Sequence, residues 1–288
     1  MNGVLRTLLA ELIDYAGLFP PAALPMRDAV ANYAAYRASG DAWALARFVI
    51  PVERLEEFAT AAEPHLREVP WRLSALAHAG HNHAIRDFNT RLAGRAEIDV
   101  VEARAATVDE VHALSPLAAL ATVYAEVPVR DDPDALVAAI AACGLRAKIR
   151  TGGVAADAFP TAEQVARFLA TCARHRVPFK ATAGLHHPLR GEYALTYDAG
   201  APRGTMFGFL NVFLAASFAQ RGLPEAELAA LLEERDPGAI AVRDDGIAWR
   251  GRVLTTAMLA ADRAAFAISF GSCSFREPLD DLSALPLP

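Results

Sequence analysis

The sequence predicts an α/β protein with the fold of a (β/α)8 TIM barrel. Seven short apolar runs alternate with stretches of helical periodicity over the first two-thirds of the chain. This alternation is typical of a parallel sheet with right-handed crossovers. An eighth apolar run near the C-terminus can close the barrel. A doubly wound open sheet is the alternative, but no GxGxxG motif follows the first run.

Two of the predicted helices carry clear start and stop signals. Asp132 can cap a helix whose first position is Pro133, and Gly144 can end that helix. Thr161 and Gln164 form a predicted capping box at the start of the next helix. The predicted strands are Ile13–Phe19, Phe48–Pro51, Leu73–His78, Ile98–Ala103, Ala121–Val127, Ala147–Thr151, Pro178–Gly184 and Ala267–Ser274.

The longest connection, residues 189–265, is predicted to be an insertion between the seventh and eighth strands of a single domain, residues 1–288. It is too long for one crossover helix. We expect it to act as a lid or as an oligomer contact, and its apolar helices favour a homo-oligomer. The residues after 278 are expected to form a loose tail. The predicted elements of the insertion are the helix Phe207–Ala219, the helix Pro224–Glu234, a hairpin of Ile240–Val242 with Ile247–Trp249, and the helix Leu254–Ala265.

Composition limits the classes of partner. Apolar residues make up 53% of the 288 residues and charged residues 22%, as in ordinary globular proteins. The net charge of −6 and the lack of basic runs argue against a nucleic-acid partner. No apolar stretch is long enough to span a membrane, and no signal peptide is recognisable. Three cysteines without a CxxC pair fit a reducing environment, so the predicted location is cytoplasmic.

Two lysines carry the strongest functional signal. Lys148 and Lys180 lie near the ends of the sixth and seventh predicted strands, where TIM barrels place their active sites. A buried ammonium is costly without a partner, so a lysine in such a place often has a lowered pKa and acts as a nucleophilic amine. A neutral lysine can form a Schiff base with a carbonyl substrate. Asp99, from the fourth strand, can shuttle protons beside it. The alternative is an Asp–Lys ion pair that only closes the barrel.

The segment from Lys148 to His186 resembles the signature region of the deoxyribose-phosphate aldolases, which are class I aldolases. The family's KTSTG motif is matched by Lys148-Ile149-Arg150-Thr151-Gly152, and its FKxxGGhR motif by Phe179-Lys180-Ala181-Thr182-Ala183-Gly184-Leu185-His186. The stretch Glu97-Ile98-Asp99-Val100-Val101 is similar to the family's EVDVV strand, and Phe270-Gly271-Ser272-Cys273-Ser274 to its FGxSS strand. Near the N-terminus, Ile13-Asp14-Tyr15 is similar to the family's aspartate-bearing first strand.

This resemblance implies a class I aldolase that needs no cofactor and no metal. Lys148 would be the Schiff-base lysine, Lys180 the neighbouring cation that favours the neutral amine, and Asp99 the group that assists proton transfer. The predicted substrate-binding residues are Arg150, Thr151, Gly184, His186, Gly271, Ser272, Ser274, Asp14 and His78.

Two departures from the family pattern bear on the substrate. The family binds a phosphate with backbone amides at a GG pair after the seventh strand, whereas this chain has Ala183-Gly184, followed by His186 in place of an arginine. Arg150 replaces a small residue and is expected to point into the barrel, where it can bind an acidic substrate or pair with Glu102 or Glu126. We therefore expect a small aldehyde, ketone or oxo-acid as the substrate, rather than deoxyribose 5-phosphate.

Three alternative functions are compatible with the same residues. The lysine pair can support another Schiff-base reaction, such as a dehydration or an isomerisation. A barrel can also bind a ligand without catalysis, because a fold does not determine a function. A metal-dependent lyase or hydrolase would use a histidine-rich loop, although its spacing matches no known metal signature. The candidate ligands of such a metal site are His78, His81, His83, Glu102, Glu126, His186 and His187.

Overall fold

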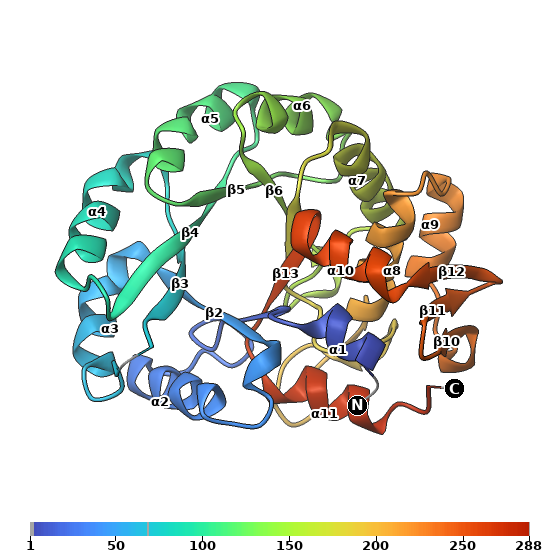
Figure 1. The fold of residues 1–288 in the computed structure, drawn as a ribbon, viewed down its shortest axis with the longest axis horizontal. Coiled ribbons are helices and arrows are strands. Elements are labelled where there is room, and N and C mark those ends of the chain that lie inside the picture. The colour runs from blue at the N-terminus through green and yellow to red at the C-terminus, as the bar shows by residue number, and fades with distance from the viewer. Residues whose placement is uncertain (1–2, 68, 288) are drawn as a thin grey trace.

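The computed structural model describes residues 3–67 and 69–287, and it confirms the predicted (β/α)8 barrel. Eight parallel strands close in the order β1-β13-β7-β6-β5-β4-β3-β2, with helices around them (Figure 1). The strands run close to the predicted positions. They are β1 (Ile13–Tyr15), β2 (Leu45–Pro51), β3 (Trp71–Leu76), β4 (Ala96–Arg104), β5 (Thr122–Glu126), β6 (Arg146–Arg150), β7 (Phe179–Thr182) and β13 (Ala267–Ser272).

The helices that cover the barrel begin largely where capping residues allow. Thr161 caps α7 as predicted, because its hydroxyl accepts from the Gln164 amide (3.3 Å) while Gln164 Oε1 accepts from the Thr161 amide (2.9 Å). The α6 helix differs in detail: Pro133 is its N-cap, and Asp132 accepts from the Asp134 amide at 3.0 Å. The helices are α1 (Gly3–Leu9), α2 (Met26–Arg37), α3 (Leu55–Ala62), α4 (Asn82–Arg91), α5 (Val108–Ala113), α6 (Asp134–Ala142), α7 (Ala162–His175), α8 (Phe209–Ala219), α9 (Glu225–Leu232), α10 (Thr256–Ala265) and α11 (Arg276–Ala284).

The long connection between β7 and β13 contains both expected and unexpected elements. The predicted hairpin is present as β10 (Ile240–Val242) and β11 (Gly246–Trp249), and a third strand, β12 (Arg252–Thr255), extends it. A second hairpin, β8 (Gly191–Ala194) with β9 (Arg203–Met206), was not predicted. Each of its strands has only four residues and includes a glycine, so neither shows a clear alternating pattern.

The apolar helix of this connection is a core element. Every residue of α8 is buried, and the helix packs against β13, α7 and α9. Figure 1 shows α9 and the β10–β12 sheet further out, at the edge of the molecule. The sequence predicted an oligomer contact because this helix is apolar. Other elements of the same chain cover its apolar surface instead.

The prediction of a loose tail after residue 278 is wrong for most of that segment. The α11 helix extends to Ala284 and buries Pro278, Leu279 and Leu282. The i, i+3 spacing of the two leucines places them on one helix face, which packs into the core. In the described part of the chain, no helix has the length and apolar character needed to cross a membrane.

Candidate active site

The two lysines are direct neighbours inside the barrel. Lys148 in β6 is in register with Lys180 in β7, and Glu126 in β5 is in register with Lys148. Residues that are in register on adjacent parallel strands point to the same face of the sheet, so these three side chains share one face. The residues Lys148 and Lys180 are only 3% and 1% exposed, so both ammonium groups depend on protein partners.

Three carboxylates supply those partners. Lys148 Nζ lies 2.6 Å from Glu102 Oε2 and 2.7 Å from Glu126 Oε2. Lys180 Nζ lies 2.6 Å from Asp14 Oδ2 and also donates to Glu102 Oε1. Glu102 thus bridges both lysines. We call these five residues the lysine–carboxylate cluster.

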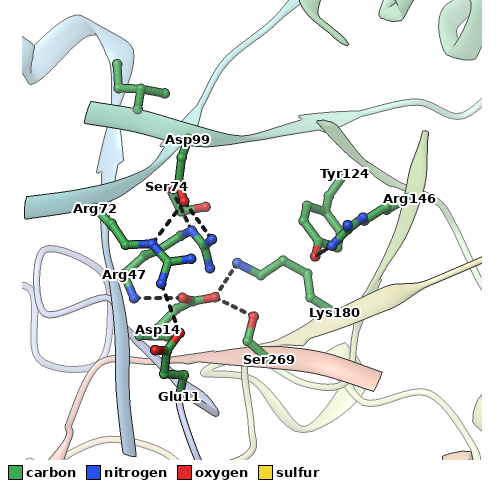
Figure 2. A network of polar contacts seen from close by, with 12 residues as sticks. Glu11, Asp14, Arg47, Arg72, Ser74, Asp99, Tyr124, Arg146, Lys180 and Ser269 are labelled. Atoms are coloured by element: carbon green, nitrogen blue, oxygen red, sulfur yellow. Dashed lines mark hydrogen bonds and ion pairs between the residues drawn. The ribbon is translucent and has the colours of Figure 1, made fainter. Parts of the chain in front are cut away.

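Neutral donors complete the cluster. The Ser74 hydroxyl donates to Glu102 Oε1 at 2.5 Å, and the Ser269 hydroxyl donates to Asp14 Oδ2 at 2.6 Å. The Arg47 backbone amide donates to the other oxygen of Asp14 at 3.0 Å. Figure 2 shows Lys180 extending toward Asp14, with Ser269 beside it. Buried charges satisfied in this way are held in one arrangement.

The charge states of the cluster follow from its contacts. Burial alone would raise the pKa of Glu102, but the ammonium groups of Lys148 and Lys180 outweigh burial and lower it well below its ordinary value. Burial works against the Lys180 ammonium, but Asp14 and Glu102 raise the pKa of Lys180 above its ordinary value. The pKa of Glu126 is also lowered: burial opposes this shift and Lys148 drives it. Lys180 is therefore a cation at neutral pH, and Glu102 is an anion.

The structure does not bring Asp99 to the lysines, which corrects the predicted role of this residue. Its carboxylate accepts two hydrogen bonds from Arg47, both 2.7 Å, and one from Arg72 at 3.0 Å (Figure 2). Burial opposes ionisation of Asp99, and the two arginines nevertheless lower its pKa. Asp99 lies nearer the start of β4, and Glu102 near the end of that strand contacts both lysines instead.

A β-bulge explains how both acids point inward. Leu73 of β3 pairs with Ile98, but the next residue, Ser74, pairs with Val100, so Asp99 is the extra residue. In a regular strand, residues 99 and 102 would face opposite sides of the sheet. The bulge changes the phase and allows both to face the interior. No feature of the sequence predicts a bulge there, although Glu102 already stood out as an acidic residue near the end of a predicted strand.

A cavity of about 240 Å³ opens above the cluster at the C-terminal ends of the strands. Lys148, Glu102 and Arg150 line it, whereas Lys180 does not. Lys148 is therefore the lysine that a ligand can reach. Much of the remaining wall is apolar and includes Phe19, Pro20, Val49, Leu76, Leu195 and Met206.

Part of the cavity wall comes from the β8–β9 connection, which sequence reasoning did not identify. Tyr197 of this connection donates a hydrogen bond to Glu277 Oε2 at 2.9 Å, and His186 Nδ1 lies 2.9 Å from the same oxygen. Burial acts against the Glu277 carboxylate, but His186 and Tyr197 lower its pKa. All three residues line the cavity. Their hydrogen bonds join the β8–β9 connection to α11. The sequence did not predict this helix.

Four of the predicted substrate-binding residues line the cavity: Arg150, Gly184, His186 and Gly271. The other five take part in the supporting structure. Asp14 lies below with Lys180. Thr151 donates to the Ala183 carbonyl at 2.5 Å. Ser272 accepts from the Ser274 amide at 3.3 Å, and Ser274 accepts from the Glu277 amide at 3.1 Å. His78 accepts from the Gly80 amide within its own loop.

The glycine two residues after β7 has a packing role. Gly184 has φ +71°, and a Cβ there would lie 2.9 Å from the Phe159 ring and 3.1 Å from Gly152 Cα. A side chain is thus excluded on two grounds. The preceding residue, Ala183, also has a positive φ of 63°, so this turn tolerates a methyl group only in a strained conformation.

The histidine-rich loop closes on itself. The His78 ring accepts a hydrogen bond from the Gly80 amide at 3.0 Å and packs on His81, with ring centroids 3.7 Å apart. This arrangement caps the short helix η3 (Ala79–His81). Within residues 3–67 and 69–287, no group of three or more His, Cys, Asp or Glu side chains is placed to hold a metal ion.

Lysine is also rare in this chain. Among the 28 lysine and arginine residues, Lys148 and Lys180 are the two lysines, and all other basic positions carry arginine. Both lysines belong to the buried cluster. Arginine stays protonated in proteins, whereas the lysine amine can lose its proton and act as a nucleophile. The chain therefore places its two side-chain amines together, one of them at the cavity.

Comparisons with known proteins do not assign a family. No family model matches the chain, and no curated protein matches it. A solved structure of lysine/ornithine decarboxylase from Vibrio vulnificus, complexed with cadaverine, is similar with a TM-score of 0.41 and 14% sequence identity. The match covers 85% of this chain and 66% of that chain, so this chain spans less than two thirds of that protein's length. The barrel fold itself follows from the strand order described above.

Proposed function

We propose that this protein is a carbon–carbon lyase of the class I aldolase type. Lys148 would form a Schiff base with a small carbonyl compound, an aldehyde, a ketone or an oxo-acid. The bond next to that carbonyl would then be cleaved or formed. The observation that carries this proposal is the position of Lys148: a primary amine at the cavity, in contact with two carboxylates and beside a second lysine.

The proposed chemistry begins with a proton transfer. The Lys148 ammonium gives its proton to Glu126, whose carboxylate lies 2.7 Å away and has one lysine partner, whereas Glu102 has two. The neutral amine attacks the carbonyl carbon, and a proton that the attacking nitrogen then loses moves to the carbonyl oxygen, which gives a neutral carbinolamine. Glu126 returns a proton to the resulting hydroxyl, which leaves as water and generates an iminium ion. In the cleavage direction, a hydroxyl on the β-carbon loses its proton to the Glu126 carboxylate and becomes a carbonyl. The bond between the α- and β-carbons breaks, and its electron pair passes to the iminium, which becomes an enamine.

Lys180 has a different role in this proposal. It is held as a cation by Asp14 and Glu102 and does not line the cavity. Its charge fixes Glu102 in place and repels a second positive charge at Lys148. The proposed nucleophile is therefore Lys148 alone, and Lys180 positions the carboxylate between the two amines.

Reductive trapping tests the proposal. The protein is incubated with borohydride and a panel of small aldehydes, ketones and oxo-acids, and the intact mass is measured. A panel member that forms a Schiff base adds its own mass irreversibly. The matched variants are Lys148→Arg and Lys180→Arg, because arginine keeps the positive charge beside Glu102 but cannot form the imine. Circular dichroism verifies that each variant is folded.

The outcomes separate the candidate functions. An adduct on wild type and on Lys180→Arg, but not on Lys148→Arg, supports the proposal, and the panel member identifies the substrate class. Binding of a panel member without any adduct would instead indicate a non-catalytic barrel. A preference for deoxyribose 5-phosphate over all the unphosphorylated compounds would contradict the proposed substrate class.

A further inference from the structure

We infer that Arg150 binds a carboxylate of the substrate, so that the carbonyl compound attacked by Lys148 is a short oxo-acid. This inference rests on the proposed function and narrows its substrate class. It starts from strand β6, whose three inward cations are Arg146, Lys148 and Arg150. Each of them faces a different set of partners.

Arg150 is the cation of this strand that remains available. Arg146 donates to the Tyr124 hydroxyl at 3.0 Å, and Lys148 contacts two carboxylates. The Arg150 guanidinium makes no hydrogen bond to any residue in the described part of the chain. The acid with which it pairs there, Glu126, lies 3.6 Å from its Nε and already contacts Lys148 through its other oxygen. None of the five N–H donors of the guanidinium is therefore committed to a hydrogen bond with another described residue.

The Arg150 side chain faces the cavity and is accessible. It is 46% exposed and lines the same cavity as Lys148, and much of the wall of this cavity is apolar. A planar guanidinium in such surroundings favours a bidentate carboxylate over a neutral group. The cavity, at about 240 Å³, is smaller than the roughly 300–1,000 Å³ pockets that hold drug-sized ligands. A small anionic carbonyl compound fits these properties.

The shared contact with Glu126 limits the length of the substrate. Lys148 Nζ lies 2.7 Å from Glu126 Oε2, and Arg150 Nε lies 3.6 Å from Glu126 Oε1. The two carboxylate oxygens are about 2.2 Å apart, so the two nitrogens are separated by at most about 8.5 Å. Once the imine bond and a hydrogen bond of about 2.8 Å are subtracted, about one to three carbon–carbon bonds remain between the carbonyl carbon and the carboxylate carbon. Pyruvate and 4-oxopentanoate fall within this range, and 6-oxoheptanoate falls outside it.

The experiment compares each oxo-acid with its methyl ester, which keeps the carbonyl and removes the charge. The concentration that gives half-maximal borohydride trapping is measured for pyruvate, 4-oxopentanoate, 6-oxoheptanoate and their esters. For the two shorter acids, wild type is expected to need a concentration about 10–100-fold lower than for the ester. Arg150→Gln is expected to remove that advantage, so that each short acid and its ester reach half-maximal trapping at concentrations within about two-fold of one another in this variant. The longest acid should show no advantage over its ester.

Arg104→Gln is the matched control. The Arg104 side chain is 84% exposed, lies 3.7 Å from the same Glu126, and does not line the cavity, so this change should leave the advantage of the acids intact. Esters trapped as well as acids by wild type, or an advantage that survives Arg150→Gln, would overturn the inference while the Schiff-base function stands. Stronger trapping of glyceraldehyde 3-phosphate than of any oxo-acid, dependent on Arg150, would also overturn it. Absence of trapping with every compound would contradict the proposed function itself.

Discussion

Glu102 is the residue on which the lysine–carboxylate cluster depends most. Its two oxygens contact Lys148 at 2.6 Å, Lys180, and Ser74 at 2.5 Å, and the residue is 4% exposed. Glu102→Gln keeps the shape but replaces one acceptor by an amide that faces ammonium groups. Breaking a buried ion pair by removing one partner costs about 3–5 kcal/mol. Lys148 keeps Glu126 and Lys180 keeps Asp14, so we expect about 3 kcal/mol, a large share of a typical stability of about 5–15 kcal/mol.

The pH dependence of this loss follows from the pKa of Glu102, which is lowered from an ordinary value of 4.5. A carboxyl group with a lowered folded-state pKa stabilises the fold above its unfolded pKa. That contribution is lost as the pH falls through 4.5 toward the folded-state value. The free-energy difference between wild type and Glu102→Gln should therefore be constant near neutral pH and should shrink below about pH 4.5.

Urea unfolding followed by circular dichroism, repeated at steps from about pH 7 to about pH 3.5, measures this difference. Glu57→Gln is the matched control, because Glu57 also pairs with a cation, Arg54, but at the surface. The free energy of unfolding should change far less for Glu57→Gln, because exposed ion pairs contribute little. The reasoning is refuted if Glu102→Gln is no less stable than Glu57→Gln, or if its deficit is the same at the lowest pH.

Three further predictions concern individual residues. Acetic anhydride should modify Lys148 faster than Lys180, because Lys148 lines the cavity, and peptide mapping that shows the reverse order would contradict this. Asp99→Asn should destabilise the fold, because Arg47 and Arg72 lose an anionic partner. The same variant should keep borohydride trapping at Lys148 within about two-fold of wild type. A complete loss of trapping in a folded variant would restore a catalytic role for Asp99. Tyr197→Phe removes the hydrogen bond to Glu277, so amide hydrogen exchange in residues 194–203 should become several-fold faster, and unchanged exchange would show that other contacts hold this connection.

The fold could be predicted because strand and helix signals alternate strongly along this chain. The neighbouring positions of Lys148 and Lys180 also followed from the sequence, since each lies near the end of a strand and the strands are consecutive in the barrel. Asp99 was misplaced along its strand, because it lies nearer the start of β4, where Arg47 and Arg72 bind it. The inward position of Glu102 could not be predicted, because a one-residue bulge changes the phase of β4 and periodicity alone cannot reveal a bulge.

Small polar residues at strand ends were harder to assign. Thr151 and Ser274 have the residue types of a substrate site, but they form hydrogen bonds with nearby backbone atoms. Tyr197 and Glu277 were missed for the opposite reason. They come from two segments about 80 residues apart that meet only in the folded chain, so neither carries a local signal.

The most direct test of the central claim is to locate the trapped carbonyl compound in the wild-type protein. The chain has two lysines, so after borohydride reduction and proteolysis, peptide mapping shows which of the two, if either, carries the added mass. We predict that the peptide containing Lys148 carries the adduct and that the peptide containing Lys180 stays unmodified. An adduct on Lys180, or one confined to the N-terminal amine, would contradict the assignment of Lys148 as the nucleophile.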